Sequence, residues 1–471
     1  MELEIVGGSK GASTLSVTAQ GGEPHRGGRP VKLGVARQPA ARPPARADEP
    51  RFVPMRVLVL SNMYPPHAFG GYERECADAV RRWATAGHQV LVLTSDVYLS
   101  PELRRFAGTA GEEDEAGVEV RRVLKLYWED HVVVRPPLWR RLRWERSNQG
   151  ELEDAVRRFR PEVASAWAMG AMSLGLLTRL GQLGVPVVSV VRDQWPEYAP
   201  HIDAWSDFVS GHPRLAPLAR ALTGLPCALP DLDALGPTCF ITETVLRGAR
   251  ERSPWTFPGA EIVPGYVDRA ELHPGPDAGR RRWSWRLLHV GRFDPRKGIH
   301  IAVEALARLP AESTLSVLGS GDVRYLEELQ GLARRLKVAE RVHFGSTPRN
   351  ELRAHYAAAD ALVFAPLWEE GFGLVPLEAM ACGTPVVASP TGGATELMAD
   401  GENCLIFEGG NPESLARALG RLAADPGLRR KLVDGGLATA AHYDTDRLVA
   451  ELEALHKRAL LPAAPETASR D

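Results

Sequence analysis

The sequence predicts an α/β protein built from two Rossmann-like, doubly wound parallel sheets that face a cleft. In both halves of the chain, short apolar runs alternate with amphipathic helical patterns. Glycine-rich or basic loops directly follow several of these runs, at the edge where open α/β sheets bind ligands. The 471 residues and the hydrophobic content of 44% suffice for two or three domains with their own cores.

The first series of elements starts at Met55, and we assign residues 55–275 to it. Its first helical pattern ends at Gly87, which is the usual residue after a helix. The pattern predicts strands at 56–61, 89–94, around 163 and at 185–191, with helices at 72–86, around 148–158 and through 174–177.

The second series covers residues 276–445 and joins the first around residues 270–284. It has the same alternation, so we expect a second doubly wound sheet. Its predicted strands start at Leu287 and lie at 315–318, 342–344, 361–364 and 385–387.

Residues 1–54 have a different composition from the rest of the chain. They are rich in Gly, Pro, Ala and Arg, and no apolar run among them is long enough for a signal peptide or a membrane span. We expect this segment to be disordered, or Met55 to be the true start of translation.

The run from Glu369 to Ala388 contains two carboxylates around a glycine-rich loop, Glu370 and Glu378. Pro376 fits the first turn of a helix, whose free N–H groups then face the loop and favour a diphosphate. Because two carboxylates do not bind phosphates, they are better placed to accept hydrogen bonds from ribose and sugar hydroxyls. The run therefore predicts a nucleotide-sugar site.

A basic loop at 290–298 supports this prediction. Arg292 and Lys297 follow the apolar pair Leu287-Leu288 and precede a helical pattern. At the carboxyl edge of a parallel sheet, these two cations can bind a diphosphate. The alternative is a solvated basic loop without a ligand.

These motifs resemble those of the retaining glycosyltransferases of family 4, which have the GT-B fold. The resemblance runs from about Met55 to about Leu460 and is strongest over 286–410. Four features carry it: Pro65-Pro66 to Gly70-Gly71, the GRFDPRKG run at 291–298, the pair Glu370 and Glu378, and ACGTPVVAS at 381–389.

The resemblance implies transfer of a sugar from a nucleoside diphosphate sugar to a hydroxyl of a polysaccharide, a lipid-linked glycan or a small metabolite. No metal and no other cofactor is implied, and the helix within 446–471 is expected to cross to the first domain. The implied roles are diphosphate binding for Arg292 and Lys297, ribose binding for Glu378, and sugar binding for Glu370 with the amides of Phe372, Gly373 and Leu374. Gly70 and Gly71 are implied to lie across the cleft. Independently of the resemblance, Gly319 is expected to turn a strand into the helix at Val323, near the nucleotide base.

One position departs from the family pattern. The segment after the strand at 185–191 reads Arg192-Asp193-Gln194-Trp195, where the family usually has His at the first position. The change is compatible with a different donor, a different acceptor geometry or lost activity, with Asp193 taking a polar role beside the sugar. Alternatively, Arg192 only pairs with a nearby carboxylate.

Composition excludes some partners. The formal charge of −2 argues against a nucleic-acid protein, and the five scattered cysteines show neither zinc nor disulfide spacing, which predicts a reducing cytoplasm. The acidic pair Asp231 and Asp233 imitates a metal-binding D-x-D motif but does not follow a clear strand, so we expect no metal there.

Residues 135–146 combine five arginines with Trp139 and Trp144. This pattern predicts peripheral contact with an anionic membrane, at its inner face. The alternative is a solvated basic face whose tryptophans pack inward.

Two rival functions remain from the sequence. A glycoside hydrolase could use Glu370 and Glu378 as acid and base, but it leaves Arg292 and Lys297 without a role. A catalytically silent nucleotide-sugar-binding homologue is the rival that Arg192 motivates.

Overall fold

A computed structural model of the chain describes residues 53–68, 70–97, 112–114, 116–129, 132–276 and 278–461. These residues belong to one compact unit that begins at Val53. The prediction of disorder for 1–54 falls, except for its last two residues, outside the described part of the chain. Among the described residues, no helix has the length and apolarity that a membrane span requires.

The first half contains an eight-stranded sheet with the order β10-β9-β8-β7-β1-β2-β4-β3. All neighbouring strands are parallel except β3, which pairs antiparallel with β4. The strands are β1 (Arg56–Ser61), β2 (Gln89–Ser95), β3 (Glu112–Glu113), β4 (Glu119–Leu124), β7 (Val163–Ala166), β8 (Val187–Val191), β9 (Thr238–Phe240) and β10 (Glu261–Ile262), and β5 (Trp128–Glu129) and β6 (Val132–Val133) form a separate hairpin.

The helices of this half are α1 (Gly71–Thr85), α2 (Leu138–Phe159), α3 (Gly175–Gln182), α4 (Trp195–Ile202), α5 (Ala204–Gly211), α6 (Ala216–Thr223), α7 (Leu232–Leu235) and α8 (Glu243–Arg252).

Helix α2 begins ten residues before the predicted position of about 148. The residue before it, Pro137, is extended and starts the helix. The first turns of α2 are arginine- and tryptophan-rich and bury little, so they lack the apolar periodicity on which the prediction relied.

The second half contains a six-stranded parallel sheet with the order β13-β12-β11-β14-β15-β16. Numbered from its first strand, this is the 3-2-1-4-5-6 order of a Rossmann fold. The predicted fold class, two doubly wound parallel sheets, is confirmed. The strands are β11 (Arg286–Val290), β12 (Thr314–Leu318), β13 (Val342–Gly345), β14 (Ala361–Phe364), β15 (Val386–Ala388) and β16 (Leu405–Ile406).

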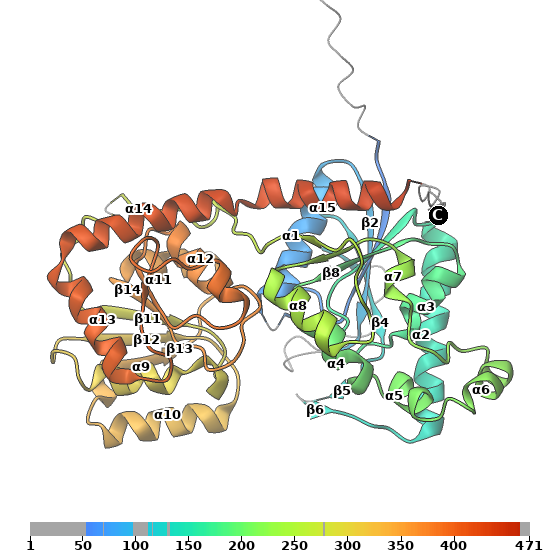
Figure 1. Cartoon of the computed structure of the whole chain (residues 1–471), viewed down its shortest axis with the longest axis horizontal. Helices are drawn as coiled ribbons and strands as arrows, with labels where there is room; N and C mark the ends of the chain where they lie inside the picture. Colours follow the sequence, from blue (N-terminus) through green and yellow to red (C-terminus); the bar gives the residue numbers. More distant parts are fainter. Residues whose placement is uncertain are drawn as a thin grey trace, which may run out of the picture. The chain divides into compact units, whose positions relative to one another are not determined.

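Its helices are α9 (Ile299–Leu306), α10 (Val323–Arg335), α11 (Arg349–Ala358), α12 (Leu374–Ala381), α13 (Pro412–Ala424), α14 (Pro426–His442) and α15 (Thr445–Ala459), with short 3₁₀ turns η2 (Pro295–Lys297), η3 (Ala339–Arg341) and η4 (Gly393–Glu396). Helix α14 packs against α12. Helix α15 instead lies along the first half (Figure 1) and contacts α1, β7 and β8. Its Leu448, Leu452 and Leu455 join a core that also includes residues of β1, β7 and β8.

Two carboxyl groups lie buried between α2 and α5. Glu145 accepts hydrogen bonds from the hydroxyls of Tyr127 and Ser173, both at 2.6 Å. Asp203 accepts the backbone N–H groups of Leu174, Trp205 and Ser206 at 2.9–3.2 Å. Burial, with the negative charge of Asp203 added, raises the pKa of Glu145 from 4.5 to about 8.

This carboxyl group predicts a pH-dependent loss of stability. Folded Glu145 keeps its proton while the unfolded chain releases it, so the free energy of unfolding should fall as pH rises from about 4.5 towards 8. Glu145→Gln should remove on the order of 2–4 kcal/mol of this fall, since one pKa unit corresponds to about 1.4 kcal/mol. Urea unfolding at a series of pH values measures it. The control Glu153→Gln, on the exposed face of α2, should show the same fall in unfolding free energy with pH as the wild type. An equal fall in wild type, Glu145→Gln and Glu153→Gln contradicts the prediction.

Candidate functional site

The two sheets each reverse their strand order at one point. In the first sheet the reversal lies between β1 and β7, and in the second between β11 and β14. Ligands of open α/β folds bind outside the carboxyl ends of the strands at such points. The loops that leave β1, β11 and β14 carry the predicted residues at 70–71, 292–297 and 370–374. The topology therefore brings these loops to the expected place.

The loop after β11 presents the two predicted cations. Asp294 caps the η2 turn by accepting the N–H of Arg296 at 3.0 Å. Gly298 has φ +64°, and a side chain there would overlap the carbonyl oxygen of Ala365 at the end of β14. Only glycine allows this close approach of the two loops.

Lys297 reaches the neighbouring loop. Its Nζ lies 2.6 Å from Glu370 Oε1, and both side chains are partly buried. Arg292 is more open, with 44% of its side chain exposed and Asp294 3.9 Å away. The site thus offers one cation neutralised by a carboxylate and a second cation that faces solvent.

Glu378 lies in the middle of α12, and two side chains of α11 hold its carboxylate. Arg349 Nη1 donates to Oε1, and the Tyr356 hydroxyl donates to Oε2 at 2.8 Å. Each carboxylate oxygen keeps further acceptor capacity. Neither Arg349 nor Tyr356 is a residue that the sequence motifs indicated, because both contacts cross about 20–30 positions of chain with no local pattern.

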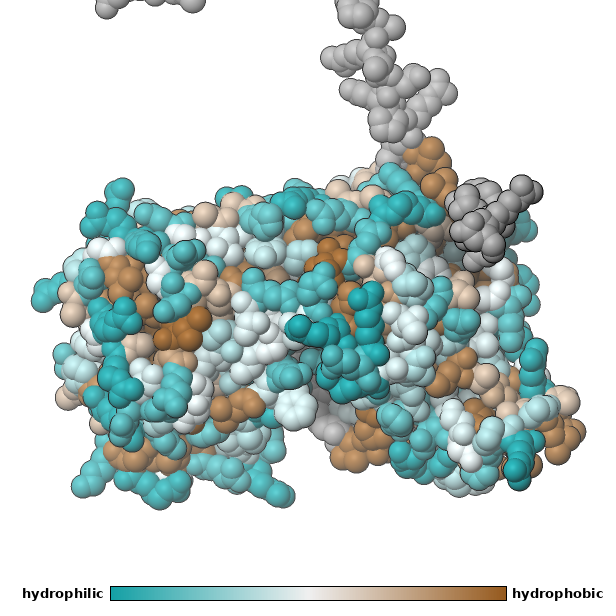
Figure 2. All heavy atoms as spheres, in the orientation of Figure 1, coloured by the Kyte–Doolittle hydropathy of each residue, from teal (hydrophilic) through white to brown (hydrophobic). Residues whose placement is uncertain are grey.

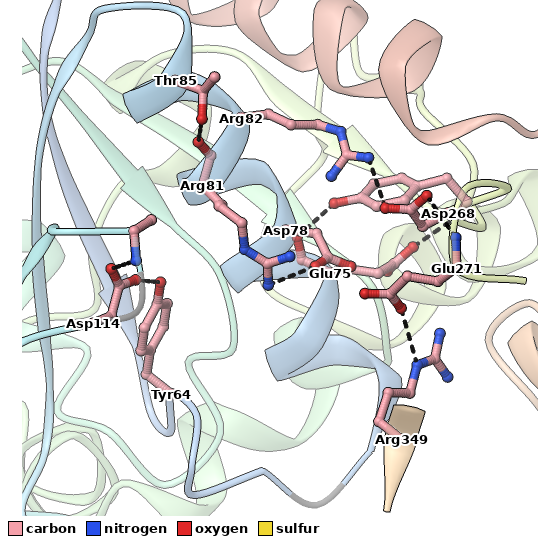
Figure 3. Close-up of polar contacts among 12 residues, drawn as sticks. Tyr64, Glu75, Asp78, Arg81, Arg82, Thr85, Asp114, Asp268, Glu271 and Arg349 are labelled. Carbon is pink, nitrogen blue, oxygen red and sulfur yellow. Dashed lines mark hydrogen bonds and ion pairs between the residues drawn. The ribbon is translucent and has the colours of Figure 1, made fainter. Parts of the chain in front are cut away.

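Arg349 also extends the site towards the segment that joins the two halves. Its Nε lies 3.7 Å from Glu271, and Figure 3 shows this pair beside Asp78 and Arg81 of α1. Next to it, Arg82 of α1 contacts Asp268 at 2.9 Å and Asp446 of α15 at 2.8 Å. Charged contacts therefore link α11, the joining segment, α1 and α15.

The first half meets the site through the start of α1. A side chain on Gly71 would overlap Leu374 at the start of α12, and one on Gly265 would overlap Phe372 and Leu374. Phe372 is buried and packs edge-on against Tyr443, with ring centroids 5.3 Å apart. Gly373, with φ +100°, is the residue from which α12 begins. The predicted Gly71, Phe372, Gly373 and Leu374 thus come together where the halves touch.

Two carboxyl groups of the first half border this junction. Glu73, in the first turn of α1, accepts a hydrogen bond from the N–H of Gly70 at 3.0 Å. Burial raises the pKa of Glu73, and the positive charge of Arg292 opposes this rise. Asp193 follows β8 and accepts from the Tyr198 hydroxyl at 2.7 Å, and burial raises its pKa to about 6. The sequence motifs did not indicate Glu73, although a Glu three residues after a helix cap is a recognisable capping pattern.

Arg192 lies beneath the site instead of opening into it. Its guanidinium is buried, lies 3.5 Å from Glu75, donates to the carbonyl of Val263 and stacks near the rings of Trp167 and Tyr266. Burial raises the pKa of Glu75 to about 7, and Arg192 opposes that rise. The guanidinium thus has the carboxylate partner that the alternative interpretation of Arg192 expected. Only its backbone carbonyl approaches the loop, at Gly371.

The remaining predicted residues have structural partners. A side chain on Gly319 would overlap the carbonyl of Gly291, so the loop after β12 lies against the Arg292 loop. Asp231 caps α7, and Asp233 accepts from the N–H and hydroxyl of Thr256 and from the N–H of Phe257. Within the described ranges, no cluster of three or more His, Cys, Asp or Glu side chains could hold a metal.

A cavity of about 220 Å³ lies elsewhere, at the amino ends of β11 and β14. Its lining includes Trp283, Asp360 and Arg429. None of the residues predicted for the site lines it, so it does not contribute to the arrangement described above.

The profile described as Glycosyl transferases group 1 matches residues 279–437, and the profile described as Glycosyltransferase Family 4 matches residues 69–223. The chain belongs to glycosyltransferase family 4. This confirms the resemblance that the motifs indicated. The two matched ranges contain Gly70 and Gly71 on one side and Arg292, Lys297, Glu370 and Glu378 on the other.

Curated relatives of this family 4 chain include a D-inositol 3-phosphate glycosyltransferase from Acidothermus cellulolyticus, 39% identical over 216 residues that cover 42% of this chain and 48% of that protein. A GDP-mannose-dependent alpha-(1-6)-phosphatidylinositol monomannoside mannosyltransferase from Mycolicibacterium smegmatis is 37% identical over 222 residues, 43% of this chain and 58% of that protein. The chain therefore spans about half the length of these curated relatives.

Solved structures share the fold. Sucrose-phosphate synthase from Thermosynechococcus elongatus is 20% identical with a TM-score of 0.65 and covers 86% of this chain and 98% of its own. An Anabaena protein crystallised with UDP-glucose is 20% identical with a TM-score of 0.60, over 85% of this chain and 99% of its own. At these identities the likeness shows the GT-B fold of this family 4 chain.

The buried pair of Arg192 and Glu75 predicts strong energetic coupling. Arg192→Met leaves Glu75 buried without its cation, which should cost about 3–5 kcal/mol of unfolding free energy. The double variant Arg192→Met/Glu75→Gln should recover much of that loss. Urea unfolding of the two single variants and the double variant measures the coupling, with Arg143→Met on the exposed surface of α2 as a control within about 0.5 kcal/mol of wild type. Additive effects contradict it.

Proposed function

We propose that this family 4 chain is a retaining glycosyltransferase that moves a sugar from a nucleoside diphosphate sugar to an acceptor hydroxyl. The observation that carries the proposal is the meeting of Arg292, Lys297 and Glu370 at the strand-order reversal of the second sheet, against the start of α1. This arrangement combines cations for a diphosphate with a carboxylate for hydroxyl groups.

The chemistry follows from where charge develops. The bond between the anomeric carbon and the diphosphate oxygen breaks, so the leaving group gains negative charge while the ring becomes positive. Arg292 and Lys297 stabilise that negative charge more in the transition state than in the ground state. The acceptor oxygen bonds to the anomeric carbon on the same face, and its proton passes to the leaving phosphate oxygen.

The carboxylates orient the donor. Lys297 holds one oxygen of Glu370 at 2.6 Å, which leaves the other to accept from a sugar hydroxyl. Arg349 and Tyr356 each donate to one oxygen of Glu378 and so fix its carboxylate, and the remaining lone pairs can accept from the ribose hydroxyls. Lys297 therefore couples the position of the sugar to that of the diphosphate.

Asp193 and Glu73 lie on the acceptor side of the junction. Because burial raises the pKa of both groups, each is a candidate to exchange hydrogen bonds with an acceptor hydroxyl. The inositol-containing acceptors in the names of the two relatives suggest a polyol or lipid-linked glycan acceptor here. Gly70 supports the diphosphate only if its N–H exchanges Glu73 for a phosphate oxygen.

A catalytically silent nucleotide-sugar-binding protein is the second candidate. The absence of the usual histidine at 192 favours it, because the guanidinium of Arg192 is buried and already engaged by Glu75 and by the carbonyl of Val263. It would keep donor binding and lose turnover.

We also propose peripheral membrane contact through 135–146, at the cytoplasmic face. The structure divides this segment: Trp139 is exposed, whereas Trp144 packs against Tyr127. Arg135 and Arg141 are engaged by Asp207 and by backbone carbonyls, so the contact falls to the exposed Arg143 and Arg146.

A thermal-shift and calorimetric screen of UDP, GDP, ADP and dTDP sugars tests the donor site. One class should stabilise the wild type, and Glu378→Ala should weaken its binding at least tenfold, since a hydrogen bond to a charged group contributes about 1.5–3 kcal/mol. Tyr356→Phe should weaken it less, and Glu340→Ala, exposed in the same half, should leave it unchanged. Failure of every donor to bind the wild type overturns both the transferase and the silent homologue.

Turnover separates those two candidates. With the donor identified, release of nucleoside diphosphate in the presence of inositol, glycan and lipid-linked acceptors should be detectable. Lys297→Met should lower kcat by about 10²–10³, because it removes a fixed charge at the leaving group, whereas Lys431→Met on the exposed side of α14 should not. Donor binding without turnover by the wild type supports the silent homologue.

A further inference from the structure

Helix α6 and the residue before it, Leu215, expose a row of leucines. Leu215, Leu218 and Leu222 are 52%, 58% and 75% exposed. Their spacing of three and four residues places them on one face of the helix. No residue of α6 is buried, and its Ala216 and Ala219 only flank a small core. The helix therefore turns its large apolar side chains to the outside and its small ones to the protein.

The start of α2 exposes two more large apolar side chains. Leu138 and Trp139 are 45% and 67% exposed. Both helices border the same small core around Tyr127 and Trp205, to which α2 contributes Leu142 and Trp144. Figure 2 shows hydrophobic side chains at the edge of the first half where Figure 1 places α6. We call Leu138, Trp139, Leu215, Leu218 and Leu222 the leucine–tryptophan surface.

The two chain segments that carry this surface hold charges of one sign. Residues 211–224 contain Arg214 and Arg220, both exposed, and no Asp or Glu. The first turns of α2 add Arg143, and residues 138–144 also lack an acidic side chain. Apolar side chains flanked by arginines are typical of helices that lie in the interface of anionic membranes.

The same charges argue against other occupants. A two-fold dimer would place each surface against its own copy and bring like charges together. A protein partner would have to supply several carboxylates around an apolar centre. An anionic bilayer supplies phosphates for Arg214 and Arg220 and a hydrocarbon boundary for Leu218 and Leu222 at once.

We propose that α6, with the first turn of α2, inserts its leucine–tryptophan surface into the headgroup–acyl boundary of an anionic membrane. The purpose of this contact rests on the proposed function: it would bring the acceptor side of the transferase to lipid-linked acceptors. The proposal extends the membrane contact proposed for 135–146, because it assigns the apolar anchor to α6 and lets the neighbouring arginines bind lipid phosphates.

Co-sedimentation of the full chain with vesicles of phosphatidylcholine alone, or with about one third phosphatidylglycerol, tests it. The wild type should bind the mixed vesicles, and Leu218→Ser/Leu222→Ser should weaken binding at least tenfold. Arg214→Glu/Arg220→Glu should also weaken it, and more so at low salt. Val323→Ser, a matched exposed apolar residue of the second half, should bind as the wild type does.

Three results of the vesicle experiment overturn the proposal. They are absence of wild-type binding to mixed vesicles, binding that survives the leucine substitutions, and an equal loss with Val323→Ser. A concentration-dependent dimer, abolished by the same leucine substitutions in light scattering, overturns it in favour of a self-interface. Thermal stabilisation by the donor should be the same in the wild type and in the leucine variant. If the wild type binds vesicles but no donor, the proposed function is wrong, whereas the proposal of a membrane-binding surface is retained.

Discussion

Three glycines allow the two halves of this chain to pack closely against each other at the site. Gly71 and Gly265 leave the room that Leu374 and Phe372 fill, and Gly371 lets the carbonyl of Arg192 approach. A side chain at Gly71 or Gly265 would force Leu374 or Phe372 to move, and one at Gly371 would meet the backbone of Arg192. The cations of the loop after β11 and the carboxyl groups of the first half border one junction only because this contact is so close.

The charges at the junction are organised in pairs. Lys297 neutralises Glu370, Arg349 neutralises Glu378, and Arg192 neutralises Glu75 one layer below. Among these cations Arg292 is the exception, because its nearest carboxylate is 3.9 Å away and nearly half of its side chain is exposed. A diphosphate that enters the site can therefore gain most from Arg292, while the paired residues keep their geometry.

Much of this could be predicted from the sequence. The alternation of elements gave the sheet class, and the loops at 291–298 and 370–378 lie where parallel sheets bind ligands. The start of α2 could not be predicted, because its exposed turns carry no apolar period. The partners of Glu378 and Arg192 could not be predicted either, since Arg349, Tyr356 and Glu75 are distant in sequence and only packing brings them near. Glu73 had a local signal, because it lies three residues after Gly70, the N-cap of α1.

The two donors on Glu378 have an evolutionary consequence. A substitution at 378 alone leaves the guanidinium of Arg349 and the hydroxyl of Tyr356 without their shared acceptor, and a substitution at 349 alone removes the cation from a partly buried carboxylate. Such changes are favourable only in combination. Positions 349, 356 and 378 therefore form one epistatic unit. Redesign of the nucleotide end of this site has to change the three residues together.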